Sequence, residues 1–128
     1  MESRIGEVHR VQQTLKWAIP VAFIAHGLGM IGGIYFVFAT KSWFGELFGD
    51  ALLMARILTA LLWVVSGVAF VAAGWGYWHQ LEWWRTAAWV AAPTSIVGIA
   101  LWAGPIPAGT YVGGLMAAAT LVALALGW

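Results

Sequence analysis

The chain has no cysteine and very little charge. Its 128 residues include six Lys and Arg and five Asp and Glu, and the formal net charge is +1. The absence of thiols excludes disulfides, thiolate metal sites, cysteine nucleophiles and dithiol redox couples. The small net charge excludes the basic field on which nucleic-acid binding depends. We therefore expect no nucleic-acid partner.

Apolar residues make up 62% of the chain, and charged residues only 9%. Ordinary globular domains contain about a quarter charged residues, so this composition is typical of a membrane protein. About 20 apolar residues suffice to cross a hydrocarbon layer of about 30 Å. The sequence predicts four membrane spans, at about residues 15–39, 51–74, 86–103 and 110–128.

The segments between these spans are short, which favours antiparallel neighbours. The sequence thus predicts an all-α, integral membrane four-helix up-down-up-down bundle that forms one domain over residues 1–128. Residues 1–14 are more polar and are expected to form a short cytosolic helical tail, surface-lying or frayed. Gly74 and Gly76 are expected to end the second span.

The distribution of basic residues predicts the orientation. With the N-terminus inside, four basic residues are cytosolic and two lie on the far side, a bias that follows the positive-inside rule. We expect a multi-pass protein of the cell inner (plasma) membrane with both termini in the cytosol. The cytosolic residues are Arg4, Arg10, Lys16 and Arg85, and the others are Lys41 and Arg56.

Small residues recur at four-residue spacing in every predicted span. In lipid, helices associate by close backbone approach, which small residues permit. Because all spans carry such a stripe, the pattern indicates packing within one chain rather than a dedicated dimer motif. The stripes are Ala25, Gly29 and Gly33; Ala69 and Ala73; Ala87, Ala91 and Ser95; Gly113 and Ala117.

His26 lies near the middle of the first span. Ala22, Gly29 and Gly33 fall within about 60° of it on the helix surface, so the imidazole is expected to follow the packing stripe toward another helix. His26 lies about 15 Å along the helix from Lys16, deep enough in the span that its polar side chain needs a hydrogen-bond partner.

Several partners for His26 are open. One is structural, a neighbouring hydroxyl or a carbonyl such as that of Trp89, which Pro93 frees from the helix ladder. The others are a hydrogen bond to a quinone or similar ligand, a proton relay, and axial ligation of a haem or bacteriochlorophyll metal. His26 is the candidate ligand if any metal is bound.

Arg56, inside the predicted span 51–74, is the second candidate. It lies about 9 Å below the outer end of its helix. If the hydrocarbon layer is about 30 Å thick and the depth of His26 is counted from the opposite end, the two residues lie within a turn or two of each other. The two residues could then line one cavity. The alternative is an interfacial arginine paired with Asp50 or Glu46.

Two of the ten tryptophans, Trp63 and Trp89, fall inside predicted spans. They could wall a flat cofactor or quinone pocket, although buried indoles more often fill space. The remaining eight fall at span ends and predict an interfacial belt: Trp17, Trp43, Trp75, Trp78, Trp83, Trp84, Trp102 and Trp128.

The run HGLGMIGG, residues 26–33, resembles the first-helix HG-x-x-K-L-x-G pattern of the DoxX-like family of small four-helix membrane proteins. The stretches SGVAFVAAGWG, residues 66–76, and WWRTAAW, residues 83–89, resemble its second and third helices. Met30 stands where the family often has a lysine. The resemblance implies a four-helix bundle that often works as a membrane subunit beside a redox enzyme, as in thiosulfate:quinone oxidoreductase.

The first functional hypothesis is an accessory or quinone-proximal subunit of a membrane redox assembly. Its partners would be the lipid bilayer and other membrane subunits, and it would not be catalytic on its own because its short loops cannot build a soluble active site. One alternative is a haem- or bacteriochlorophyll-binding protein in which His26 is the axial ligand. The other is a small transporter, whose polar path would run along His26, Arg56, Thr59, Ser66, Thr94 and Ser95.

Overall fold

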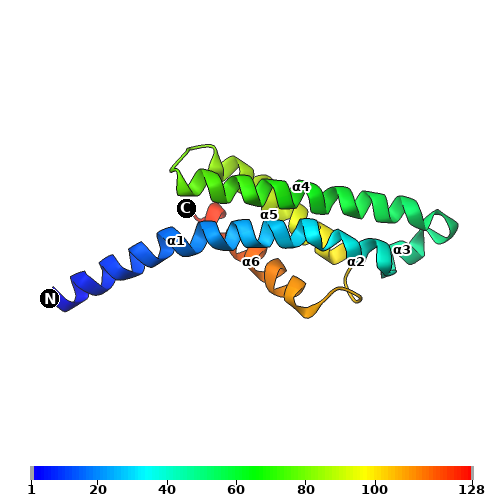
Figure 1. Cartoon of the computed structure of the whole chain (residues 1–128), viewed down its shortest axis with the longest axis horizontal. Coiled ribbons are helices and arrows are strands. Elements are labelled where there is room, and N and C mark those ends of the chain that lie inside the picture. The colour runs from blue at the N-terminus through cyan, green and yellow to red at the C-terminus, as the bar shows by residue number, and fades with distance from the viewer. Residues whose placement is uncertain (1, 128) are drawn as a thin grey trace.

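The chain is helical throughout the residues that the structure, a computed structural model, describes, namely 2–127 (Figure 1). No strand is present in that range, so the predicted all-α class is confirmed. The elements are α1 (Glu2–Gly32), α2 (Ile34–Ala39), α3 (Trp43–Leu47), the short 3₁₀ turn η1 (Gly49–Ala51), α4 (Leu52–Trp78), α5 (Trp84–Leu101) and α6 (Ala108–Ala125).

Each of the four predicted spans coincides with a long helix. Three helical segments are long and apolar enough to cross a membrane: Glu2–Ala39, Gly49–Trp78 and Ala108–Ala125. The fourth predicted span corresponds to α5, which carries Arg85, Thr94 and Ser95 and is less apolar.

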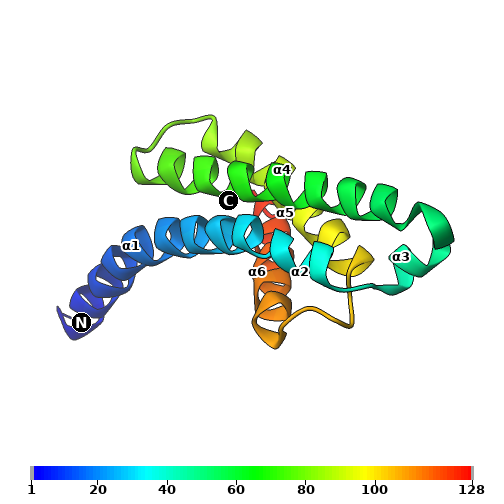
Figure 2. The same cartoon turned by 45° about the vertical axis from the view of Figure 1, so that its right-hand side comes forward.

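The helices form an open arrangement. α4 packs between α1 and α5, and α5 packs between α4 and α6. In Figure 2, α6 crosses behind α1 at a steep angle. Over residues 2–127, α1 therefore has its main interface with α4, and α6 with α5. The side between α1 and α6, which a closed bundle would seal, is left open as a groove.

The antiparallel pair α1 and α4 meets backbone to backbone at Gly27 and Gly67. A Cβ added to Gly27 would lie 2.5 Å from the carbonyl oxygen of Gly67, and one added to Gly67 would lie 2.7 Å from that of Gly27. The expected stripe through Ala25 and Gly29 is wrong for α1, because both residues are exposed. The residues of α1 that are buried are Pro20, Phe23, Gly27 and Met30.

The second predicted span corresponds to α4. Its helix was expected to end at Gly74 or Gly76, but α4 continues to Trp78. Both glycines permit close packing instead. A Cβ on Gly74 would lie 2.9 Å from the carbonyl oxygen of Pro20, and one on Gly76 would lie 2.8 Å from Cβ of Trp84. A glycine in an apolar helix is thus as easily a contact point as a helix end.

Residues 2–14 are helical and continuous with the first predicted span. They are the first turns of α1, which runs without interruption from Glu2 to Gly32 and projects beyond the other helices (Figure 1). The end of α1 that projects lies on the same side as the turn between α4 and α5 and the end of α6.

Candidate functional site

His26 points from α1 into the space between the other three long helices. Its Nε2 lies 2.9 Å from Oγ of Ser95 on α5. Its ring meets Phe70 of α4 edge to face, with the centroids 4.7 Å apart. Its other edge rests on Gly113 of α6, where an added Cβ would overlap the ring. The expected inward orientation is confirmed, and a neighbouring hydroxyl is the structural partner.

The bond to Ser95 holds one ring nitrogen and leaves the other available. If the serine hydroxyl donates to Nε2, the ring proton is on Nδ1, where it can donate to a ligand. Ser95 Oγ also lies 4.0 Å from Sδ of Met30, a weaker acceptor for the same hydroxyl proton. In the described chain, Nδ1 is found with no hydrogen-bond partner.

His26 lines an open crevice of about 220 Å³ between α1 and the first turn of α6. Sites for drug-sized ligands measure about 300–1,000 Å³, so this crevice suits a single ring better than a macrocycle. Thr110 supplies a second polar group to its wall. The other lining residues are Ala25, Gly29, Met30 and Gly109.

Arg56 is not beside His26. Its Nη2 donates a hydrogen bond to the carbonyl oxygen of Thr40, 3.0 Å away, at the far end of α4. Phe70, which contacts His26, is fourteen residues further along α4, and this separates the two sites by about 21 Å. The expectation that the two residues line one cavity is therefore wrong. It counted their depths from the opposite ends of a span of about 30 Å, but α1 and α4 are both longer than such a span.

Trp63 is 1% exposed and fills space. The indole lies between Gly33 and Gly98, and a Cβ added to Gly98 would be 2.7 Å from Cδ1 of Trp63. This contact leaves no slot for a planar ligand on that side of the indole. Trp63 Nε1 is buried without a hydrogen-bond partner among the described atoms.

Two tryptophans occupy the reverse of their expected positions. Trp89, expected inside a span as a space-filling side chain or a pocket wall, is 46% exposed on the outer face of α5. Trp102, assigned to the interfacial belt, is fully buried, and its Nε1 donates to Oγ1 of Thr40, 2.9 Å away. Apolar segments alone do not tell which face of a helix meets protein.

Ser42 belongs to a polar cluster that the sequence analysis missed. Its hydroxyl lies 2.7 Å from the carbonyl oxygen of Leu101, to which it donates. Trp43 donates from Nε1 to the carbonyl oxygen of Ala100, 2.8 Å away. Both bonds fasten α3 to the end of α5. A serine directly before a short aromatic helix, a common N-cap position, was the one available signal.

Three of the four hydroxyls of the expected polar path, those of Thr59, Ser66 and Thr94, donate to backbone carbonyls. Thr94 donates to the carbonyl of Val90 at 2.6 Å, and Ser66 donates to that of Ala91 at 3.2 Å. These bonds stabilise α5 around Pro93, which lies inside the helix. They do not connect into a chain across the bundle.

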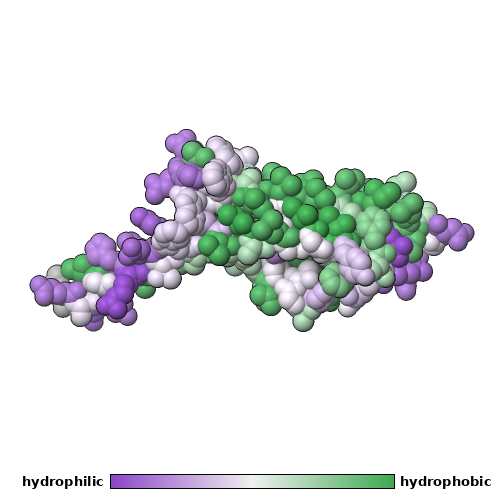
Figure 3. All heavy atoms as spheres, in the orientation of Figure 1, coloured by the Kyte–Doolittle hydropathy of each residue, from purple (hydrophilic) through white to green (hydrophobic). Residues whose placement is uncertain are grey.

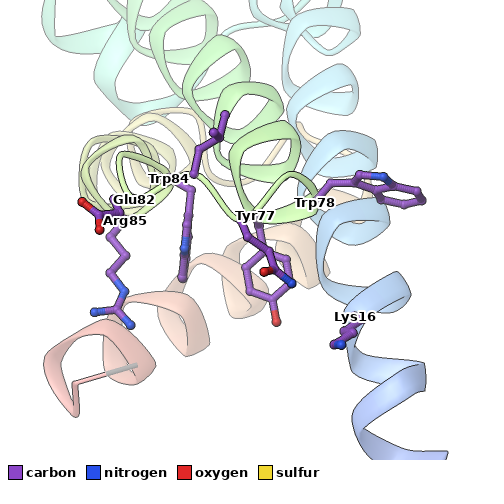
Figure 4. A pocket seen from close by; sticks show the side chains of 8 residues that line it. Lys16, Tyr77, Trp78, Glu82, Trp84 and Arg85 are labelled. Atoms are coloured by element: carbon purple, nitrogen blue, oxygen red, sulfur yellow. The ribbon is translucent and has the colours of Figure 1, made fainter.

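The groove between α1 and α6 holds a further, apolar cavity of about 320 Å³. Toward the projecting end of α1 it adjoins a polar cavity of about 670 Å³ (Figure 4). Tyr77 and Trp84 line both cavities. On α1, Lys16 lines the polar cavity, Ala22 lines the apolar cavity and His26 lines the crevice. The three spaces therefore follow one another along the groove.

Axial ligation by His26 does not fit this geometry. Nε2 faces Ser95, and the crevice of about 220 Å³ is too small for a macrocycle. Within residues 2–127 no group of three His, Cys, Asp or Glu side chains is arranged to hold a metal ion. No protein-family model, curated protein or solved structure matches the chain. Its function has to be inferred from the geometry.

Proposed function

We propose that the chain is an integral membrane protein of four spans that acts as a quinone-binding accessory subunit of a membrane redox assembly. The observation that carries this proposal is the crevice at His26. It places one unengaged imidazole nitrogen and one threonine hydroxyl beside a space of single-ring size that opens between two apolar helices.

The surface supports membrane insertion. Figure 3 shows an apolar middle region between two hydrophilic ends. Large apolar side chains in this region are exposed, such as Val68 at 56% and Leu115 at 72%. No Asp, Glu, Lys or Arg occurs between Lys16 and Lys41 or after Arg85. Such a surface is stable in hydrocarbon and would aggregate in water.

The fourth span is α5. Its 18 residues cover about 27 Å, close to the hydrocarbon thickness. It packs on α4 along one side and on α6 along another, so it faces protein more than lipid and needs less apolar surface. The residues that it buries are Ala88, Ala91, Ala92, Ser95, Gly98 and Ile99.

The positions of the ends support the orientation. Lys16 and Arg85 line the same cavity, and Leu124 near the end of α6 lies close to Ile19 of α1. Both termini and the turn after α4 therefore lie at one end of the molecule, which contains most of the basic residues. The positive-inside rule assigns that end to the cytosol.

In the crevice, a quinone carbonyl would accept a hydrogen bond from Nδ1 of His26, and Thr110 would offer its hydroxyl to the ring. Ser95 would hold the imidazole in the required tautomer. The isoprenoid tail would leave through the open side between α1 and α6 into the lipid. A bound quinone would supply electron transfer to a partner subunit, consistent with the role implied by the DoxX-like resemblance.

The other hypotheses have less support. A haem or bacteriochlorophyll does not fit beside His26, for the reasons given above. A transporter requires a continuous polar path, but Thr94 and Ser66 donate to backbone carbonyls and Arg56 lies about 21 Å from His26.

Binding of decylubiquinone to the purified protein, measured by calorimetric titration in detergent, tests the proposal. His26→Phe removes the donor and should weaken binding at least tenfold. Thr110→Val should weaken it about 2- to 10-fold, the value of one hydrogen bond. Thr120→Val, the same change on the same helix outside the crevice, should have no effect. Equal binding by folded His26→Phe and wild type would reject the quinone site.

A further inference from the structure

The polar cavity at the cytosolic end is lined by two cations and one anion. Lys16 comes from α1, Arg85 from the start of α5, and Glu82 from the turn before it. Figure 4 shows Arg85 and Lys16 on opposite sides of the cavity with Trp84 and Tyr77 between them, and the carboxylate of Glu82 pointing away from Lys16. The cavity therefore presents positive charge together with a phenol hydroxyl.

The aromatic wall of this cavity fixes one of the cations. The guanidinium carbon of Arg85 lies 5.7 Å from the ring centroid of Trp84, a cation–π distance. Trp17 and Trp78 meet edge to face at 4.4 Å on the α1 side. Tryptophans of this kind gather at the headgroup level of a bilayer. The cavity thus lies where a lipid headgroup would lie.

The adjoining apolar cavity continues from this level into the groove between α1 and α6. Its walls include Ala22 and Phe23 from α1 and Met116 and Ala119 from α6. It shares no lining residue with the crevice proposed for the quinone. The two cavities together form an amphipathic site, charged at the rim and apolar inside.

We propose that this site binds one anionic phospholipid of the cytosolic leaflet. Lys16 and Arg85 attract its anionic headgroup from opposite sides of the cavity, the hydroxyl of Tyr77 donates a hydrogen bond to it, and one acyl chain lies in the groove between α1 and α6. The inference rests on the membrane insertion and orientation proposed above, but not on the quinone. The inner leaflet supplies anionic lipids at this position.

A charged rim beside an apolar cavity favours a phospholipid over a soluble anion or an acidic peptide. A soluble phosphate would use the rim but not the apolar cavity of about 320 Å³ behind it. An acidic peptide would leave the same cavity unfilled or in contact with backbone polar groups. A diacyl phospholipid satisfies the charge and the groove at once.

Native mass spectrometry of the detergent-purified full chain can test the site. Wild type titrated with dioleoyl phosphatidylglycerol should retain one molecule, with about tenfold preference over dioleoyl phosphatidylcholine. The double variant Lys16→Gln/Arg85→Gln should bind phosphatidylglycerol on the order of 30-fold more weakly, since each cation near the surface contributes about one kcal/mol. Lys41→Gln, at the opposite end, should retain the wild-type affinity.

A second pair of variants tests the groove. Ala119→Phe fills the apolar cavity and should weaken phosphatidylglycerol binding at least fivefold. Ala118→Phe is the matched control, because Ala118 is exposed on the same helix and is not part of the cavity wall. Circular dichroism and size-exclusion profiles check that each variant is folded.

Three outcomes would overturn the lipid site. They are equal retention of the two lipids by wild type, unchanged preference in Lys16→Gln/Arg85→Gln, and displacement of the lipid by millimolar glycerol 3-phosphate, which would indicate a headgroup-only site. Decylubiquinone should not displace phosphatidylglycerol, because the two sites share no lining residue. Loss of quinone binding with lipid binding intact would reject only the proposed quinone role.

Discussion

Gly27→Ala should destabilise the protein because it separates α1 from α4. The added Cβ would lie 2.5 Å from the carbonyl oxygen of Gly67 and 2.9 Å from Cγ2 of Val71. Reaching an ordinary contact of about 3.4 Å requires a shift of about 0.9 Å between two backbones, which no side-chain rotation can supply. Overpacking of this kind costs about 1–3 kcal/mol.

Gly29→Ala is the control, on the same helix and two residues away. A Cβ on Gly29 meets nothing within 4 Å. Both variants gain about 1 kcal/mol of helix propensity, so the difference between them isolates the clash. Reversible unfolding in SDS should find Gly27→Ala less stable than Gly29→Ala by about 1–3 kcal/mol. Equal stabilities would refute the observed α1–α4 register.

Two further predictions concern buried tryptophans. Trp102→Phe should cost about 1–2 kcal/mol, because it removes the hydrogen bond to Thr40 from a closed environment, whereas Trp89→Phe on the exposed face should change stability by less than about 0.5 kcal/mol. The same SDS titration measures both, and equal effects would contradict the assigned burial. Gly98→Ala should displace Trp63 and cost about 1–3 kcal/mol, with a red-shifted tryptophan emission spectrum, and an unchanged spectrum and stability would count against the contact.

The locations of the helices could be predicted from the sequence because the solvent sets them. A segment that must bury about 30 Å of backbone hydrogen bonds in hydrocarbon needs a continuous apolar run, and four such runs are readable. The inward orientation of His26 was also predictable, because an imidazole deep in a span needs a partner. Its partner Ser95 lies 69 residues away on another helix, a contact that helical periodicity within one span does not specify.

The packing faces could not be predicted, for a physical reason. In lipid, core-facing and lipid-facing residues are equally apolar, so hydropathy does not separate Gly27, which packs, from Gly29, which is exposed. For the same reason, hydropathy does not predict that Trp89 is exposed and Trp102 is buried.

The distance between His26 and Arg56 could not be predicted from the sequence, because it depends on how far each helix extends. Pairing of Thr40 with Arg56 and of His26 with Phe70 fixes that distance. These pairings depend on the backbone crossing between α1 and α4, which residue counts from the ends of the spans do not determine.

Cysteine accessibility tests the four-span topology most directly, and the absence of native cysteine makes single-cysteine variants clean reporters. The test positions, all exposed, are Ser3, Lys41, His79, Ala108 and Leu126. With a membrane-impermeant maleimide on spheroplasts, Lys41→Cys and Ala108→Cys should be labelled. Ser3→Cys, His79→Cys and Leu126→Cys should be labelled only in inverted vesicles. Labelling of His79→Cys and Ala108→Cys from the same side would show that α5 does not cross, and would contradict the four-span account.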